Sequence, residues 1–93
     1  MPKVEISQTH NVTAEEARKR IETLNKELGD KYGLTSRWQS DTEAQVERTG
    51  AKGTIRVEPN RVHVFLDLSF AMTPVKGTIE KRIKEELERL FKD

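Results

Sequence analysis

The sequence predicts an α+β fold in which an antiparallel sheet of four to five strands carries two helices on one face. Two segments with apolar residues at three- and four-residue spacing enclose a central region in which apolar residues recur at every second position. Each helical segment has one apolar stripe, and a sheet with both helices on the same face covers both stripes in two layers. The length of 93 residues fits one domain, 1–93. The expected order is β-α-β-β-β-β-α.

The first strand is predicted over residues 3–9, where apolar and polar side chains alternate. A helix follows, because Thr13 is a suitable N-cap and Glu16, three residues later, completes a capping box. Gly33 is expected to end this helix, since glycine tolerates the left-handed conformation. The apolar stripe of the helix is Ala17, Ile21, Leu24, Leu28 and Tyr32. The pattern leaves open whether the first strand pairs at the edge or the centre of the sheet.

Four further strands are predicted between residues 34 and 70, where the apolar period is two. Turn-forming residues at 41–43, 50–53 and 59–60 separate these strands, and their regular spacing favours an antiparallel meander. The last strand has the strongest pattern. Its inner face is expected to carry Val62, Val64, Leu66, Leu68 and Phe70, and its outer face His63, Phe65, Asp67 and Ser69.

The second helix is predicted from the Thr73-Pro74 pair to the C-terminus. Thr73 is a suitable N-cap, and proline is favoured at the first helical position. The apolar stripe is Ile79, Ile83, Leu87, Leu90 and Phe91. Gly77 stands in the first turn of this helix, where we expect a close neighbour to need the space.

The composition excludes several classes of protein. With no cysteine there is no disulfide framework, thiolate metal site or cysteine nucleophile, which fits the reducing cytoplasm where we expect the protein. We see neither a signal-peptide pattern nor the run of about 18 apolar residues that a membrane span needs. Seventeen basic and sixteen acidic residues give a formal charge of +1, which predicts weak attraction to nucleic acid or anionic lipid.

Catalysis is not predicted. The histidines are His10 and His63, and no motif ties a serine or a carboxylate to either. His63 and Asp67 share a strand face but are about 13 Å apart along the strand, too far for a hydrogen bond. We therefore expect two ordinary solvated histidines, no catalytic residue, no metal site and no cofactor.

Two features superficially indicate nucleic-acid binding. The order helix, strands, helix also occurs in double-stranded-RNA-binding domains, and Gly50 and Gly53 have the Gly-x-x-Gly spacing of KH domains. The KH loop joins two helices, however, whereas this segment joins two predicted strands. The last helix begins with Lys76 and no lysine cluster, and Phe65 is the only aromatic residue on the outer face of its strand. A tight hairpin turn explains the glycines, and no nucleic-acid partner is expected.

Two hypotheses name contact residues. The first is a small exposed apolar patch, because the alternation that buries Val64 and Leu66 turns Phe65 outward near the corner before the second helix. Its residues are Phe65, Met72, Pro74 and Val75, with Lys76 at the edge. The second is a pocket between the layers, lined by Trp38 and Phe70, which suits a short acyl or hydroxyacyl chain. Core packing is the simpler interpretation of Trp38, Met72 and Val75.

Three segments carry a family resemblance: Trp38-Gln39-Ser40-Asp41, the stretch 46–55, and 68–72 followed by 75–80. In this order they resemble the polyhydroxyalkanoic acid system proteins of bacteria. The middle segment is similar to the family pattern Phe-x-Arg-x-Gly-x-x-Gly-x-Ile, although Val46 replaces the phenylalanine. The pattern positions, which we expect to be structural, are Trp38, Asp41, Arg48, Gly50, Gly53, Ile55 and Gly77.

The resemblance implies a small non-catalytic cytoplasmic protein that acts at polyhydroxyalkanoate storage granules or on a granule protein. It supplies no catalytic residue. Residues 73–75 replace a more apolar lead-in to the last helix, which reduces any apolar contact surface there. The oligomeric state is left open by the sequence.

Overall fold

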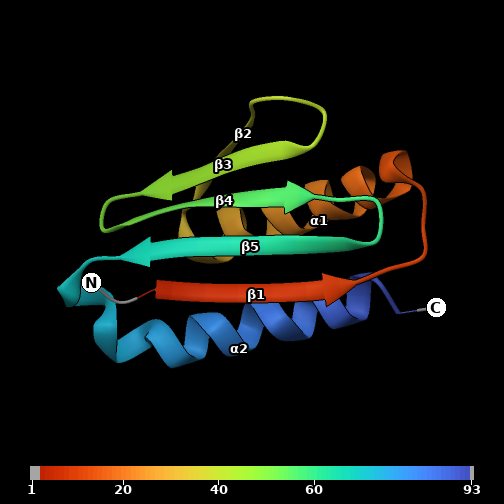
Figure 1. Cartoon of the computed structure of the whole chain (residues 1–93). Coiled ribbons are helices and arrows are strands. Elements are labelled where there is room, and N and C mark those ends of the chain that lie inside the picture. The colour runs from red at the N-terminus through yellow and green to blue at the C-terminus, as the bar shows by residue number, and fades with distance from the viewer. Residues whose placement is uncertain (1–2, 93) are drawn as a thin grey trace.

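In the computed structural model, which describes residues 3–92, a five-stranded antiparallel sheet is combined with two helices (Figure 1). The strands are β1 (Lys3–Thr9), β2 (Thr35–Trp38), β3 (Glu43–Arg48), β4 (Ala51–Val57) and β5 (Arg61–Leu68). The helices are α1 (Ala14–Tyr32) and α2 (Thr73–Leu90), and a short 3₁₀ turn, η1 (Phe70–Met72), precedes α2. The α+β class and the order β-α-β-β-β-β-α are as predicted.

The strand order in the sheet is β1-β5-β4-β3-β2, with every neighbouring pair antiparallel. Strands β2 to β5 form the predicted meander. The first strand lies at an edge, beside the last strand of the sequence, which resolves the question that the sequence left open (Figure 1).

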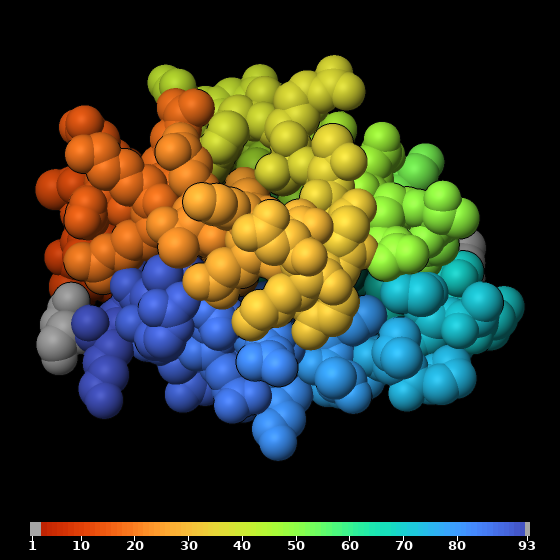
Figure 2. Space-filling model, turned by 180° about the vertical axis from the view of Figure 1, so that it is seen from behind, coloured from red at the N-terminus to blue at the C-terminus, as the bar shows by residue number. Residues whose placement is uncertain are grey.

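Both helices cover one face of the sheet. Helix α1 packs against β2 and β4, and α2 packs along β1. From behind, the two helices lie side by side and run in opposite directions (Figure 2). The sheet's side chains on this face form the core with the helix stripes, and burying each large aliphatic side chain contributes about 1.5–3 kcal/mol. The fully buried large residues are Val4, Ile21, Leu24, Val46, Ile55, Val62, Val64, Leu68, Ile83 and Leu87.

Helix α1 begins and ends where the sequence predicted, after Thr13 and before Gly33. The backbone N–H of Glu16 donates a 3.1 Å hydrogen bond to Thr13 Oγ1, which satisfies one of the free donors of the first turn. Gly33 is left-handed with φ of 70°, and its N–H donates to the Gly29 carbonyl oxygen at 3.0 Å.

Three expectations around the start of α2 are wrong. Phe70 is 76% exposed in η1 rather than on the inner face of β5, because the strand ends at Leu68 and the chain turns there. Thr73 is the first residue of α2 and not its N-cap, because η1 already brings the chain into helical geometry. Gly77 has open space around it, since an added Cβ would meet no atom within 4 Å.

Candidate functional site

The predicted contact patch is divided between two surfaces. Phe65 lies on the open face of the sheet and is 38% exposed. Strand pairing places Lys3, Asp67 and Lys52 in one row across β1, β5 and β4, one step beyond Phe65 toward η1. This charged row separates Phe65 from η1 and the start of α2. The prediction of a single apolar patch that includes Phe65 is therefore wrong.

An exposed apolar surface remains where β5 passes into α2, which we call the apolar corner. It consists of Phe70, Ala71, Pro74 and Val75. All four are exposed, with Val75 42% and Phe70 76% accessible. Lys76 lies at its border and pairs with Glu80 at 3.9 Å. The patch hypothesis named Pro74 and Val75 correctly as exposed, so core packing, the simpler interpretation of Val75, is wrong. The hypothesis missed Phe70, because the two-residue period of β5 continues formally through that position.

Met72, another predicted contact residue, turns inward. It is half-buried and packs against the core. A Cβ added to Gly50 would lie 3.4 Å from Met72 Cγ, so this side chain covers the β3–β4 turn. The same turn holds the backbone of the corner, because the Ser69 N–H donates to the Gly50 carbonyl oxygen at 2.8 Å. The simpler interpretation of Met72, core packing, applies.

The two glycines of the Gly-x-x-Gly segment have distinct steric roles. Gly50 has φ of 86°, which favours glycine, and a Cβ there would also lie 3.1 Å from Ser69 Oγ. Gly53 lies within β4, and a Cβ there would lie 2.5 Å from Leu66 Cδ2 and closer still to the Phe65 carbonyl oxygen. Both glycines are explained by packing within the fold.

A shallow groove of about 580 Å³ adjoins the apolar corner. It lies where β1 begins, β5 ends and the β3–β4 turn reverses the chain, at the left end of Figure 1. The lining residues are Lys3, Arg48, Gly50, Ala51, Lys52, Asp67, Leu68 and Ser69. The sequence analysis did not identify this groove, because its walls come from three segments that only the sheet brings together.

Three further family positions, Trp38, Asp41 and Arg48, connect helix α1 to the rest of the fold. The Arg48 guanidinium donates to the Tyr32 carbonyl oxygen in the last turn of α1, where a cation is favoured by the helix dipole. At the other end of α1, Arg18 lies 4.5 Å over the Trp38 ring and its Nη1 is 3.1 Å from Asp41 Oδ1.

Trp38 and Phe70 do not line a common pocket. Trp38 is half-buried against the core beneath Arg18, whereas Phe70 is in the exposed turn η1. The predicted pocket between the layers is therefore wrong for this pair. Ile55, another of the family pattern positions, is fully buried in the core between the sheet and the helices.

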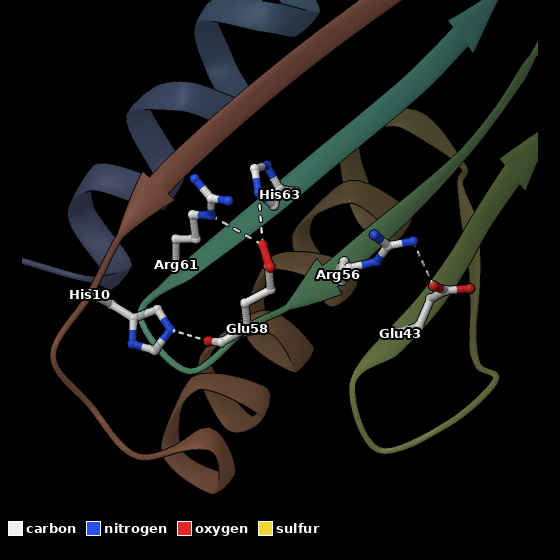
Figure 3. Close-up of polar contacts among 6 residues, drawn as sticks. All are labelled: His10, Glu43, Arg56, Glu58, Arg61 and His63. Carbon is white, nitrogen blue, oxygen red and sulfur yellow. Dashed lines mark hydrogen bonds and ion pairs between the residues drawn. The ribbon is translucent and has the colours of Figure 1, made fainter.

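His63 has a carboxylate partner that sequence reasoning missed. Its Nε2 lies 2.8 Å from Glu58 Oε1, and Arg61 Nε lies 3.2 Å from the same oxygen (Figure 3). The Phe65 ring stacks on the imidazole with centroids 5.8 Å apart. Glu58 and His63 flank the β4–β5 turn. Their position on either side of the Pro59-Asn60 pair is the sequence feature that could have predicted this contact. Together these residues form a polar cluster on the open face.

His10 is buried, so its predicted solvent exposure is wrong. Only 6% of the residue is accessible, and its ring lies against Phe91 with centroids 5.3 Å apart. Nδ1 accepts from the Val12 N–H at 3.3 Å, so the proton is on Nε2, which donates to the Glu58 carbonyl oxygen at 2.9 Å (Figure 3). His10 thereby joins the end of β1 to the β4–β5 turn and to the end of α2.

A carboxyl pair links the two helices. The pKa of Glu27 is raised, chiefly by its hydrogen bond to Glu86 and then by burial. The pKa of Glu86 is lowered, because its carboxylate accepts hydrogen bonds from Glu27 and Arg89. Arg89 Nη2 lies 2.8 Å from Glu27 Oε1 and 2.6 Å from Glu86 Oε2. This cluster acts between α1 and α2 and is not part of the groove lining.

The observations define a small α+β protein with an exposed apolar corner beside a groove. Within residues 3–92, no group of three or more histidine or acidic side chains is placed to hold a metal ion. In the same part of the chain, neither helix has the length and apolarity that crossing a membrane requires. The chain belongs to the family described as "Putative polyhydroxyalkanoic acid system protein", whose model matches residues 4–91. The family resemblance is thereby confirmed.

A solved structure with a TM-score above 0.5 shares the fold. The NMR structure of PA4090 from Pseudomonas aeruginosa is 12% identical, with a TM-score of 0.63 over 100% of this chain and 88% of that chain. The crystal structure of TTHA0849 from Thermus thermophilus is 10% identical, with a TM-score of 0.39 over 98% of this chain and 92% of that chain. No curated protein matches the sequence.

Proposed function

We propose that this chain is a non-catalytic protein of the polyhydroxyalkanoate system that attaches to storage granules through the apolar corner. Membership of the family supports a role in the polyhydroxyalkanoate system. The observation that supports the contact surface is Phe70, a large aromatic side chain that is 76% exposed. The proposal places the protein in the cytoplasm, where such granules are stored, and covers contact with either the polyester or a protein on its surface.

The apolar corner suits a contact surface because its backbone is held in place. Ser69 N–H is bonded to Gly50, and the Met72 N–H donates to the Ser69 carbonyl oxygen at 2.9 Å. A fixed turn loses little conformational freedom when it binds. Burying Phe70 and Val75 would each contribute about 1.5–3 kcal/mol before the cost of association.

A non-catalytic role is supported by the chemistry of the open face. The His63–Glu58 pair carries an imidazole beside a carboxylate, which is an arrangement found in catalytic sites. Ser7 pairs with His63 across β1 and β5, yet no hydrogen bond between their side chains is present among the described residues. Glu58 is instead shared with Arg61, which makes the cluster an ion-pair network at the surface.

Co-sedimentation with purified granules tests the proposal. The double variant Phe70→Ser/Val75→Ser should leave the granule fraction while retaining the thermal midpoint of the wild type, because both side chains are exposed. Phe65→Ser is the matched control: it removes an exposed aromatic residue from the open face and should still bind. Undiminished sedimentation of the double variant would contradict the assignment of the corner.

Granules stripped of their own proteins separate the two modes of contact. Binding of the wild type to stripped granules would mean direct contact with polymer or lipid, whereas binding only to native granules would mean a protein partner. Failure to bind either preparation would overturn the proposed function.

A further inference from the structure

We propose that the groove beside the apolar corner binds an apolar chain that ends in a single carboxylate, such as a free fatty acid. This site is separate from the granule contact, since the groove lining includes none of the four residues of the apolar corner. The inference therefore goes beyond the proposed function and can fail independently of it.

The size and the lining of the groove suit a small amphiphile. Its volume of about 580 Å³ lies within the range of ligand pockets, roughly 300–1,000 Å³. Most of its accessible lining is apolar, although Ala51 and Leu68 are themselves buried, with 6% and 1% of each residue exposed. Lysine side chains at its margin add hydrocarbon stems while their ammonium groups stay in water.

The groove lining carries an excess of positive charge. Lys3 and Lys52 stand directly opposite Asp67 on either side, in the register of β1, β5 and β4. Among the described residues, none of these three side chains has an ion-pair partner within 4 Å. Glu47 stands opposite Lys52 on its other side, in β3, but lies outside the groove lining. Within the lining on this side, two ammonium groups flank one carboxylate, which leaves an excess of one positive charge.

Arg48, the other cation of the groove, is directed elsewhere. Its guanidinium donates to the Tyr32 carbonyl oxygen, where the C-terminal end of the α1 dipole offsets part of its charge. Counted over the lining residues, the excess is therefore close to one unit of positive charge. That excess matches a carboxylate monoanion better than a doubly charged phosphate, which would add negative charge beside Asp67.

Calorimetric titration with butanoate, hexanoate and octanoate tests the apolar part of the site, at concentrations below micelle formation. Each methylene that enters the groove should tighten the dissociation constant roughly three- to fourfold, the factor that corresponds to about 0.8 kcal/mol. Octanoate should therefore bind about tenfold more tightly than hexanoate. Equal binding of the three acids, or binding of inorganic phosphate as strong as that of octanoate, would overturn the proposal.

The double variant Lys3→Met/Lys52→Met tests the charged part of the site, because it keeps the hydrocarbon stems and removes both ammonium groups. We expect at least a tenfold loss of octanoate affinity and unchanged binding of 1-octanol. Arg56→Met is the matched control, because it removes a cation from the same face of β4, outside the groove. Octanoate binding that survives in the double lysine variant would refute the site.

Two further measurements keep the site separate from the granule contact. Thermal melting confirms that each variant is folded, since a native-state ligand must also raise the midpoint. The Phe70→Ser/Val75→Ser variant should bind octanoate like the wild type, and a tenfold loss there with no loss in the lysine variant would place the ligand on the corner and overturn the groove. Granule co-sedimentation of the lysine variant reports on the granule contact alone.

Discussion

The backbone of β4 at Gly53 passes so close to the carbonyl oxygen of Phe65 in β5 that no side chain fits between them. A Cβ at this position would also come within 2.5 Å of Leu66 Cδ2. Both strands lie in the middle of the sheet, with a neighbour on each side, so neither can shift without disturbing others. This contact explains the second glycine of the Gly-x-x-Gly segment in steric terms, without a ligand.

Gly53→Ala should therefore lower the free energy of unfolding by about 3 kcal/mol or more, the upper range for overpacked positions. Gly77→Ala is the matched comparison, since it changes the same residue type at an open position near the start of α2. That substitution should stabilise the protein by about 0.5–1 kcal/mol, because alanine loses less conformational entropy in a helix. Urea unfolding of both variants measures the difference, and a Gly53→Ala variant as stable as the wild type would contradict the contact.

Asn25→Leu should raise the stability of the fold. Asn25 is 7% exposed on α1, and its Oδ1 is buried without a hydrogen-bond partner among the described residues. Leucine has a similar size and removes this uncompensated acceptor, so we expect a gain of about 1–2 kcal/mol. For a domain of this size the thermal midpoint would rise by roughly 4–8 °C per kcal/mol. Asn11→Leu, at an exposed position, should show no such gain, and a lowered midpoint for Asn25→Leu would contradict the prediction.

His10→Ala should destabilise the protein by about 2 kcal/mol or more. The change leaves the Glu58 carbonyl oxygen and the Val12 N–H without their imidazole partner and removes packing against Phe91. His63→Ala, on the open face, breaks a surface ion pair and should cost at most about 1 kcal/mol. Thermal melting at neutral pH compares the two; equal losses would show that His10 does not join the elements as described.

Glu27→Gln should stabilise the protein at pH 7 and not at pH 4. The raised pKa of Glu27 means that its stabilising contribution is complete below the usual value of 4.5 and is lost as pH rises through the folded-state pKa. Glutamine cannot ionise, so it keeps a hydrogen-bond donor toward Glu86 at neutral pH. The lowered pKa of Glu86 acts in the opposite direction: its contribution exists above 4.5 and is lost as pH falls further.

Urea unfolding of the wild type and Glu27→Gln at the two pH values measures this effect. Glu88→Gln, an exposed position on α2, serves as the control and should show no pH-dependent difference of this kind. A Glu27→Gln variant that is less stable than the wild type at pH 7 would mean that Arg89 holds Glu27 ionised.

Local pattern was sufficient for most of the fold. The Thr13 cap, the Gly33 stop and the alternation through β5 depend on neighbours within a few residues, so the chain itself carries the signal. The start of α2 was misread because η1 has no comparable signal: Phe70 continues a two-residue period although the strand has ended. The exposed side chain that supports the proposed function was thus assigned to the wrong surface.

The sequence by itself determined the class of fold, the order of its elements, the apolar side of each and the family, since periodicity and caps act over short distances. Only the tertiary structure decided that β1 joins β5 at an edge, which brings Lys3 beside Asp67 and Lys52. It also decided that Glu58 reaches His63 and that His10 is buried. The physical reason is that these contacts join residues that are far apart in the chain. They form only when the strands pair and both helices pack on one face of the sheet.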